Sequence, residues 1–175
     1  MKFSSTAQDA LAASKSYAEE FKSRYAGTEH LLLGLIESRD DVLDQTFYRL
    51  DVDRDHLKDV VISILSIEET NKLFKSDAGP AFTPRVLRII DFAKGLAQKL
   101  EKTTVDVIHL FLSLLYENDG VATSILMEYG LNFDNVIDIA KISYIKELNI
   151  GHFLIGESIF IGLSKSIKKF KKIIK

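Results

Sequence analysis

Four histidines are the side chains of this sequence best suited to chemistry, and two of them stand in the same local pattern. His30 lies in GTEHLLLGL (residues 27–35) and His109 lies in DVIHLFLSL (residues 106–114). No histidine forms an HExxH pair, and no GxSxG motif or complete phosphate-binding G-x-x-x-x-G-K-[ST] motif occurs. The absence of cysteine also excludes thiolate catalysis, thiolate metal ligation and disulfides. We therefore expect no enzyme activity, no catalytic residue, no metal site and no cofactor.

The residues around each histidine have the pattern of a helix start followed by an apolar helix. Gly27 permits a turn, Thr28 is expected to cap the helix, and Glu29 complements the positive end of the helix dipole. The leucines that follow are expected in the core. Because His30 and His109 stand in equivalent places beside an apolar stripe, we predict that each makes the same structural hydrogen bond.

Glu29 is not required for such a helix start. The equivalent stretch around His109 begins with Asp106 and has Ile108 in the place of the glutamate. The carboxylate of Glu29 would suit a guanidinium group through two hydrogen bonds, and a helix N-terminus with a hydroxyl nearby would suit a phosphate. Two roles for Glu29 therefore remain open, one at the helix dipole and one in contact with a ligand or partner.

A shift of 79 residues superposes the first half of the chain on the second half, without a gap over roughly 60 residues. Apolar spacing in the first half predicts helices over residues 7–24, 28–37, 42–50 and 56–67, with Asp40 or Asp41 and Asp53 at two of the starts. The matching pairs include Phe3/Phe82, Lys15/Lys94, Ala18/Ala97, His30/His109, Leu31/Leu110, Leu33/Leu112, Leu35/Leu114, Asp40/Asp119, Val42/Val121, Asp55/Asp134 and Asp59/Asp138.

These patterns predict an all-α fold made of two tandem four-helix repeats related by a pseudo-two-fold axis. We place repeat one at residues 1–65, a polar linker with Gly and Pro at 66–81, and repeat two at 82–148, which gives a domain over 1–148. The predicted core comprises Leu11, Phe21, Leu31, Leu33, Leu35, Leu50, Leu57, Val86, Ile90, Leu110, Leu112, Leu114, Leu126 and Val136.

Composition agrees with a globular protein. The chain has 175 residues, of which 46% are hydrophobic and 27% are charged, so it is long enough to bury a core and unlike a disordered chain. The sequence start lacks the apolar segment of a signal peptide, and no apolar run is long enough to cross a bilayer. We therefore expect a cytoplasmic location.

The motifs together resemble a known family. An F-[ST]-x-x-A-x-x-x-L start, the GTEHLLLGL block, a linker and a second start at FTPR (residues 82–85) are similar to the N-terminal repeat domain of Clp AAA+ unfoldases such as ClpC and ClpA. The resemblance covers about residues 1–148. It implies an all-α recognition module, without catalysis, that binds adaptor proteins and substrates, and in ClpC also phosphorylated arginine.

The resemblance assigns the phosphoarginine contacts to a glutamate of each GTEH block and a threonine of each F-T start. Glu29 matches the first glutamate and Thr83 matches the threonine of the second start. Ser4 stands where the first start would have threonine, and Ile108 replaces the second glutamate. The predicted binding residues are therefore Ser4, Glu29 and Thr83, and at most one of the two sites is chemically complete.

The F-T-x-R pattern also differs between the copies, because Thr6 replaces the arginine that the second copy keeps as Arg85. The function that the resemblance implies is recognition of adaptor or substrate segments, some of them marked by phosphoarginine, with Clp ATPase or protease components as partners. The alternative is a stand-alone accessory subunit that docks on the Clp assembly and regulates it. The ATPase modules of full unfoldases do not occur in this sequence.

The C-terminal segment, residues 149–175, lies beyond the region of resemblance. Apolar residues recur from Ile159 to Ile174 at helical spacing, and residues 153–175 hold six lysines against one acid, which predicts a basic amphipathic helix. Such a helix could pack on the body, dock a partner or contact a membrane surface. Parts of the segment also echo the GTEHLLLGL region, which leaves a truncated third repeat open. One basic tail on an acidic body is too narrow to predict nucleic-acid binding.

Overall fold

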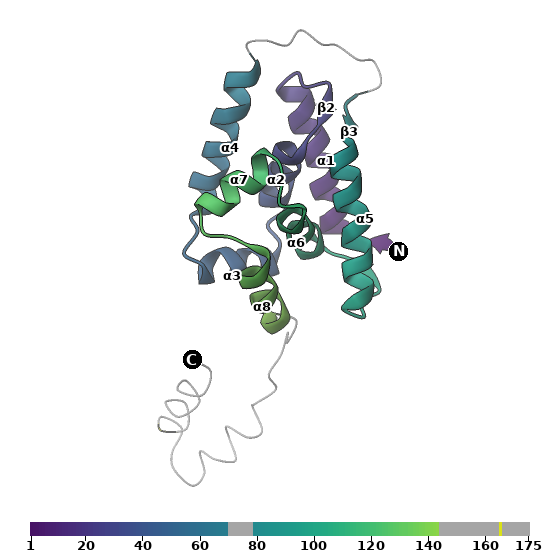
Figure 1. Ribbon diagram of the computed structural model, residues 1–175, viewed down its shortest axis with the longest axis vertical. Coiled ribbons are helices and arrows are strands. Elements are labelled where there is room, and N and C mark those ends of the chain that lie inside the picture. The colour runs from purple at the N-terminus through teal and green to yellow at the C-terminus, as the bar shows by residue number, and fades with distance from the viewer. Residues whose placement is uncertain (70–78, 144–164, 166–175) are drawn as a thin grey trace. The chain divides into compact units, whose positions relative to one another are not determined.

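The computed structural model describes residues 1–69, 79–143 and 165 (Figure 1). Within these residues there are eight helices and four two-residue strands, and they follow one another in the same order in each repeat. Repeat one contains β1 (Lys2–Phe3), α1 (Ser5–Glu20), β2 (Tyr25–Ala26), α2 (Thr28–Glu37), α3 (Asp41–Arg49) and α4 (Arg54–Glu69). Repeat two contains β3 (Ala81–Phe82), α5 (Pro84–Lys99), β4 (Thr104–Val105), α6 (Val107–Glu117), α7 (Val121–Glu128) and α8 (Phe133–Ser143). The predicted all-α duplicated fold is confirmed.

The backbone repeats with the same 79-residue offset that the sequence shows. The starts of α1, α2 and α4 lie 79 residues before the starts of α5, α6 and α8. Left-handed backbone conformations follow the same offset, with Lys22 and Glu101 at φ 51° and 56° and Arg39 and Asn118 at 47° and 49°. Residues other than glycine rarely adopt this backbone conformation, so its recurrence at equivalent positions reflects a shared loop geometry. The duplication is therefore a property of the backbone as well as of the residues.

The two repeats are joined by strand pairs that run between them. β1 of repeat one pairs in parallel with β4 of repeat two, and β3 of repeat two pairs in parallel with β2 of repeat one. The first strand of each repeat thus pairs with the second strand of the other. Two-residue strands leave no period-two pattern in the sequence, and the prediction of helices alone missed them.

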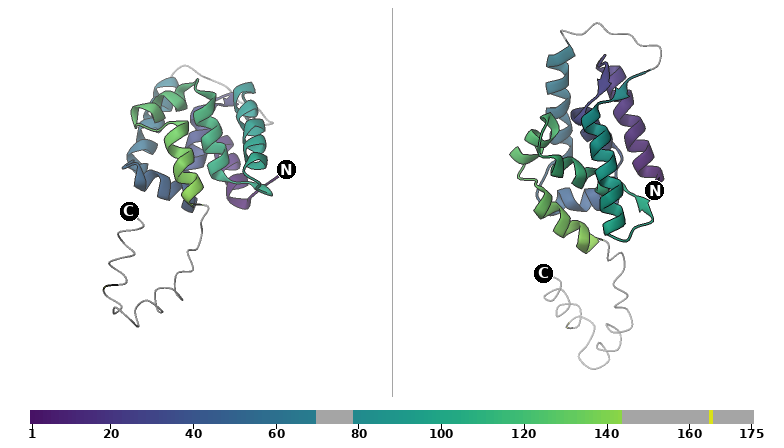
Figure 2. Two further views of the ribbon diagram at one scale, coloured as in Figure 1. Left: turned by 60° about the horizontal axis from the view of Figure 1, so that its bottom comes forward. Right: turned by 45° about the vertical axis from the view of Figure 1, so that its right-hand side comes forward.

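The apolar helices α2 and α6 occupy the interior of the unit formed by residues 1–143, with α1 and α5 running along one side of them (Figures 1 and 2). Almost every side chain of α2 and α6 is buried, as their leucine-rich sequences predict. Twelve of the fourteen predicted core residues are buried, and Leu11 and Leu50 are half-buried.

The half-buried position of Leu11 reflects how α1 packs. Its buried face consists of the small residues Ala7, Ala10, Ser14 and Ala18 rather than leucines. Small side chains let α1 approach α2 closely: a Cβ added at Gly34 would lie 2.2 Å from the backbone oxygen of Ala10. Leu50 is half-buried because it ends α3 as its C-cap.

Two predicted helix caps are confirmed. The Asp40 carboxylate accepts hydrogen bonds from the backbone N–H groups of Val42 and Leu43 at the start of α3. The Asp53 carboxylate accepts one from His56 at the start of α4. Most of the predicted linker and all of the predicted C-terminal helix except Lys165 lie outside the described residues. Among the described helices, none has the length and apolar character needed to cross a membrane.

Candidate functional site

The strand pairs divide the predicted site residues between two equivalent places. The backbone N–H of Thr83 donates to the carbonyl of Ala26 at 3.1 Å, which brings the start of α5 beside the start of α2 and Glu29. The backbone N–H of Ser4 donates to the carbonyl of Val105 at 3.0 Å, beside the start of α6. Glu29 and Thr83 therefore share one location, and Ser4 lies in the other.

We call these locations the first site and the second site. The first site consists of Thr28, Glu29, Thr83 and Arg85. The second site consists of the residues 79 positions away, namely Val107, Ile108, Ser4 and Thr6.

The predicted histidine hydrogen bond is present in both repeats. Nδ1 of His30 accepts from the backbone N–H of Gly27 at 3.1 Å, and Nδ1 of His109 accepts from that of Asp106 at 2.9 Å. Each imidazole thereby satisfies a backbone donor at a helix start that the helix itself cannot satisfy. Both rings are buried, which agrees with a structural role.

The prediction that Thr28 caps α2 is wrong. Gly27 is the N-cap residue and Thr28 is the first helical residue. Because Thr28 already lies inside the helix, its hydroxyl is not at the N-cap position from which a side chain accepts an N–H of the first turn. The Thr28 hydroxyl instead donates to the carboxylate of Glu29 at 3.2 Å.

The Glu29 carboxylate folds back over the start of its own helix. Its Oε1 atom lies 3.0 Å from Nδ1 of His30, and its side chain is 18% exposed. Burial by itself would raise the pKa of Glu29, but hydrogen bonds from His30, the backbone and Thr28 outweigh it, so the pKa lies below its ordinary value. Glu29 is therefore held in its carboxylate form.

One ring nitrogen of His30 faces two potential partners. Nδ1 either accepts from Gly27 or carries a proton and donates to Glu29, because it cannot do both at once. The other ring nitrogen, Nε2, has no hydrogen-bond partner among the described residues. The Glu29–His30 contact is thus an alternative to the bond that fixes the helix start.

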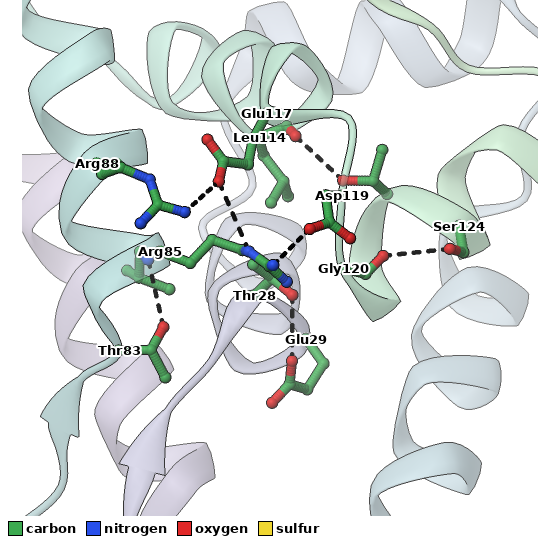
Figure 3. A network of polar contacts seen from close by, with 12 residues as sticks. Thr28, Glu29, Thr83, Arg85, Arg88, Leu114, Glu117, Asp119, Gly120 and Ser124 are labelled. Carbon is green, nitrogen blue, oxygen red and sulfur yellow. Dashed lines mark hydrogen bonds and ion pairs between the residues drawn. The ribbon is translucent and has the colours of Figure 1, made fainter.

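Arg85 brings a positive charge to the first site from repeat two (Figure 3). Its guanidinium forms an ion pair with Asp119, and its Nε atom lies 3.6 Å from the carboxylate of Glu117. Arg88 donates to the same Glu117 carboxylate at 2.7 Å. These acids hold the Arg85 head group in place, so its position does not rely on a bound ligand.

Gly120 is where repeat two approaches Thr28. A Cβ at Gly120 would lie 3.0 Å from Oγ1 of Thr28 and 3.2 Å from Nη1 of Arg85, and its φ of 112° favours glycine. Thr28, and Glu29 bonded to it, therefore lie close to the Arg85 guanidinium (Figure 3).

Thr83 caps α5 through its side chain. Its Oγ1 atom accepts from the backbone N–H of Val86 at 3.3 Å, which leaves the hydroxyl proton available to donate. Pro84 follows at the first helical position, where the missing N–H costs nothing.

The second site keeps the backbone arrangement and changes the chemistry. Ser4 caps α1 as Thr83 caps α5, with Oγ accepting from Ala7 at 3.3 Å. Val107 and Ile108 are buried, and Thr6 stands where the first site has Arg85. The second site therefore lacks both the carboxylate and the guanidinium of the first.

Sequence reasoning found Glu29 and Thr83 but not their partners. Asp119 matched Asp40 in the repeat alignment, and Arg85 matched a family pattern, yet neither was assigned to the site. The signal that could have identified Arg85 is its charge at a position where the other copy has an uncharged residue.

The fold and the paired sites define a duplicated all-α repeat domain with one polar site at the boundary between the repeats. The family model for the Clp repeat (R) N-terminal domain matches residues 2–129 and again residues 81–143. The chain belongs to this Clp N-terminal domain family.

Relatives and solved structures agree with this assignment. A probable ATP-dependent Clp protease ATP-binding subunit of Chlamydia pneumoniae is 30% identical over 125 residues, which cover 71% of this chain and 14% of that protein. The N-terminal domain of the chaperone ClpD from Arabidopsis thaliana has a similar fold, with a TM-score of 0.63, 23% identity and coverage of 83% of this chain and 96% of that one. The ClpV N-domain in complex with a VipB peptide is also similar, with a TM-score of 0.60, 20% identity and coverage of 77% and 82%.

The last part of the chain has a second similarity. Residues 115–175 match the family model of the pyridoxal phosphate biosynthesis protein PdxJ. A stretch of 43 residues is 63% identical to pyridoxine 5'-phosphate synthase of Zymomonas mobilis and covers 25% of this chain and 17% of that enzyme. The chain thus spans less than a fifth of the length of either kind of curated relative. Residues 149–175 are therefore similar in sequence to another family, which the hypothesis of a third repeat did not consider.

Proposed function

We propose that this domain recognises protein segments, from adaptors or substrates, for a Clp-type chaperone or protease assembly and performs no catalysis itself. The observation that carries the proposal is that the strand pairing places Thr83 of repeat two beside the start of α2, which holds Glu29, near a guanidinium held by acids. The names of the relatives support a role in a Clp-type assembly, and the ClpV N-domain bound to a VipB peptide supports a peptide as the kind of ligand.

The charges of the first site favour a ligand group that is both cationic and anionic. The Glu29 carboxylate would accept two hydrogen bonds from a guanidinium. The Thr83 hydroxyl and the Arg85 guanidinium would donate to a phosphate close by. A phosphorylated arginine side chain carries both groups within one residue, and we propose it as the mark that the first site reads.

The experiment is a binding titration with a fluorescent phosphoarginine peptide and its unmodified arginine counterpart. Glu29→Gln removes the charge and keeps the size, and it should weaken binding of the phosphoarginine peptide by about tenfold or more, as expected for a charged hydrogen bond. Wild-type protein should prefer the phosphorylated peptide.

Thr83→Ala and Ser4→Ala form a matched control. Each variant removes an N-cap hydroxyl at equivalent places, so both should lose about 1 kcal/mol of stability. Only Thr83→Ala should weaken peptide binding. Equal losses of binding in the two variants would contradict the assignment of the ligand to the first site.

A further inference from the structure

The two repeats place a carboxylate near the equivalent histidine by different routes. In repeat two the acid is the N-cap residue itself, with Oδ2 of Asp106 4.0 Å from Nδ1 of His109. In repeat one the N-cap is Gly27, and the acid comes from Glu29, two residues later, with Oε1 3.0 Å from Nδ1 of His30. The carboxylate of Glu29 has therefore moved into the region that an N-cap acid occupies in the other copy.

Gly27 is what leaves room for this position of Glu29. A Cβ added at Gly27 would lie 2.3 Å from Oε1 and 2.8 Å from Oε2 of Glu29, and no closer to any other group. The backbone does not itself demand glycine, because φ and ψ are −90° and −171° at Gly27 and −96° and 170° at Asp106. The missing side chain at residue 27 thus serves the Glu29 carboxylate and not the turn.

The folded-back carboxylate is already occupied. Oε2 accepts from the Thr28 hydroxyl, Oε1 faces His30, and only 18% of the side chain is exposed. A guanidinium that donates two hydrogen bonds to Glu29 needs both oxygens, so it must compete with Thr28 and His30 for them.

We propose that Gly27 is a positioning residue that lets Glu29 adopt a closed state, in which the carboxylate accepts from Thr28, lies against His30 and is withheld from the ligand. Binding then requires Glu29 to swing outward, away from Gly27. This inference rests on the proposed function for its ligand, but the closed state itself does not. The apparent affinity of the site is then its intrinsic affinity multiplied by the fraction of molecules in the open state.

Gly27→Ala tests the proposal without adding a charge. The three atoms nearest its Cβ all belong to the flexible end of Glu29, so this side chain should move outward while the fold is kept. The pKa of Glu29, followed by NMR of its side-chain carboxyl carbon, should rise toward the ordinary range as the bonds from His30 and Thr28 are lost. The phosphoarginine peptide should bind at least about threefold more tightly, because the closed state no longer competes.

Gly95→Ala is the matched control, since a Cβ at Gly95 meets nothing within 4 Å. It should change neither the pKa of Glu29 nor the affinity. If Gly27→Ala does not fold, Gly27→Asp replaces it, because Asp106 shows that the equivalent backbone accepts an aspartate. Loss of the Glu29 contact is then measured from the NMR chemical shifts of the imidazole nitrogens of His30.

The outcomes separate the two proposals. A Glu29 pKa that stays low in Gly27→Ala would overturn the closed state, whatever happens to binding. A Glu29 pKa that rises while affinity stays the same would support the closed state and overturn Glu29 as a ligand contact, and with it the proposed first site. A rise in both would support the inference as stated.

Discussion

The first and second sites have nearly the same backbone, but the first has charged side chains where the second has uncharged ones. In both, a capped helix from one repeat starts beside an apolar helix from the other, and a buried histidine bonds the backbone N–H before the apolar helix. The first site then presents Glu29 and Arg85, whereas the second presents Ile108 and Thr6. Residues that hold the backbone are therefore alike in the two copies, and residues that face the proposed ligand differ.

This comparison separates structural from functional roles within one molecule. The histidine bond occurs at a site with the glutamate and at a site without it, so the histidine serves the fold. The hydroxyl at Ser4 and Thr83 caps a helix in both copies, so its proposed ligand contact at Thr83 is an additional role. Glu29 and Arg85 occur in one copy alone, which makes them the strongest candidates for recognition.

The largest effect is expected from breaking the packing that differs between the repeats. Gly34→Ala places a Cβ 2.2 Å from the backbone oxygen of Ala10, which cannot move aside, so the free energy of unfolding should fall by about 2–3 kcal/mol. The equivalent residue in repeat two is Ser113, and Ser113→Gly should cost only about 1 kcal/mol through backbone entropy. Urea denaturation measures both, and a loss for Gly34→Ala no larger than that for Ser113→Gly would contradict the close α1–α2 contact.

The second expected effect is a change in the number of ligands bound. Wild-type protein should bind one phosphoarginine peptide per chain by isothermal titration calorimetry. Ile108→Glu combined with Thr6→Arg copies the first site into the second and should raise the stoichiometry toward two. Because Asp106 already occupies the N-cap, the new glutamate would have no glycine to fold over.

Thr6→Arg alone is the control for this double variant and should keep a stoichiometry of one, since it adds only the cation. A wild-type stoichiometry of two would show that the second site binds without Glu29-type chemistry.

The smallest expected effect concerns pH. Burial lowers the pKa of His109 below its ordinary value, although Asp106 partly opposes this shift. The unfolded state therefore binds the proton more readily, and the free energy of unfolding should fall as pH drops below about 6.5. Glu29, whose pKa is also lowered, adds a further loss only below about pH 4.3.

His109→Gln should flatten the dependence of stability on pH below about 6.5, as measured by urea denaturation at a series of pH values. The exposed His56 provides the control, because His56→Gln should leave the pH dependence of stability caused by His109 unchanged. An equal slope in wild type and His109→Gln would rule out the buried imidazole as its source.

The fold was predictable because its signals are repeated. Apolar periodicity occurs in both halves, and one 79-residue offset relates them, so the helices, the core and the paired histidine bonds could be inferred before the structure. The strand pairs could not be inferred, since two residues are too few to show a period. The Thr28 cap was wrong because the helix begins one residue earlier than that cap requires: the carbonyl of Gly27 accepts the first helical hydrogen bond, from Leu31, so Gly27 is the N-cap.

The site was predictable only in its parts. Glu29 and Thr83 could be identified one by one, but their juxtaposition depends on which strand of one repeat pairs with which strand of the other. The ion pairs of Arg85 with Asp119 and Glu117 depend in turn on where the end of α6 faces α5. The folded-back Glu29 reflects a rotamer choice that no spacing of residues encodes.

The exchange of strands between the repeats has a consequence for the origin of the domain. A single four-helix unit leaves both of its short strands without a partner, but two identical units arranged about a two-fold axis would satisfy all four. Such an ancestor would have been a symmetric homodimer whose binding positions were obliged to be the same. Gene duplication put both halves into one polypeptide, and one position could then keep Glu29 and Arg85 while the other changed to Ile108 and Thr6.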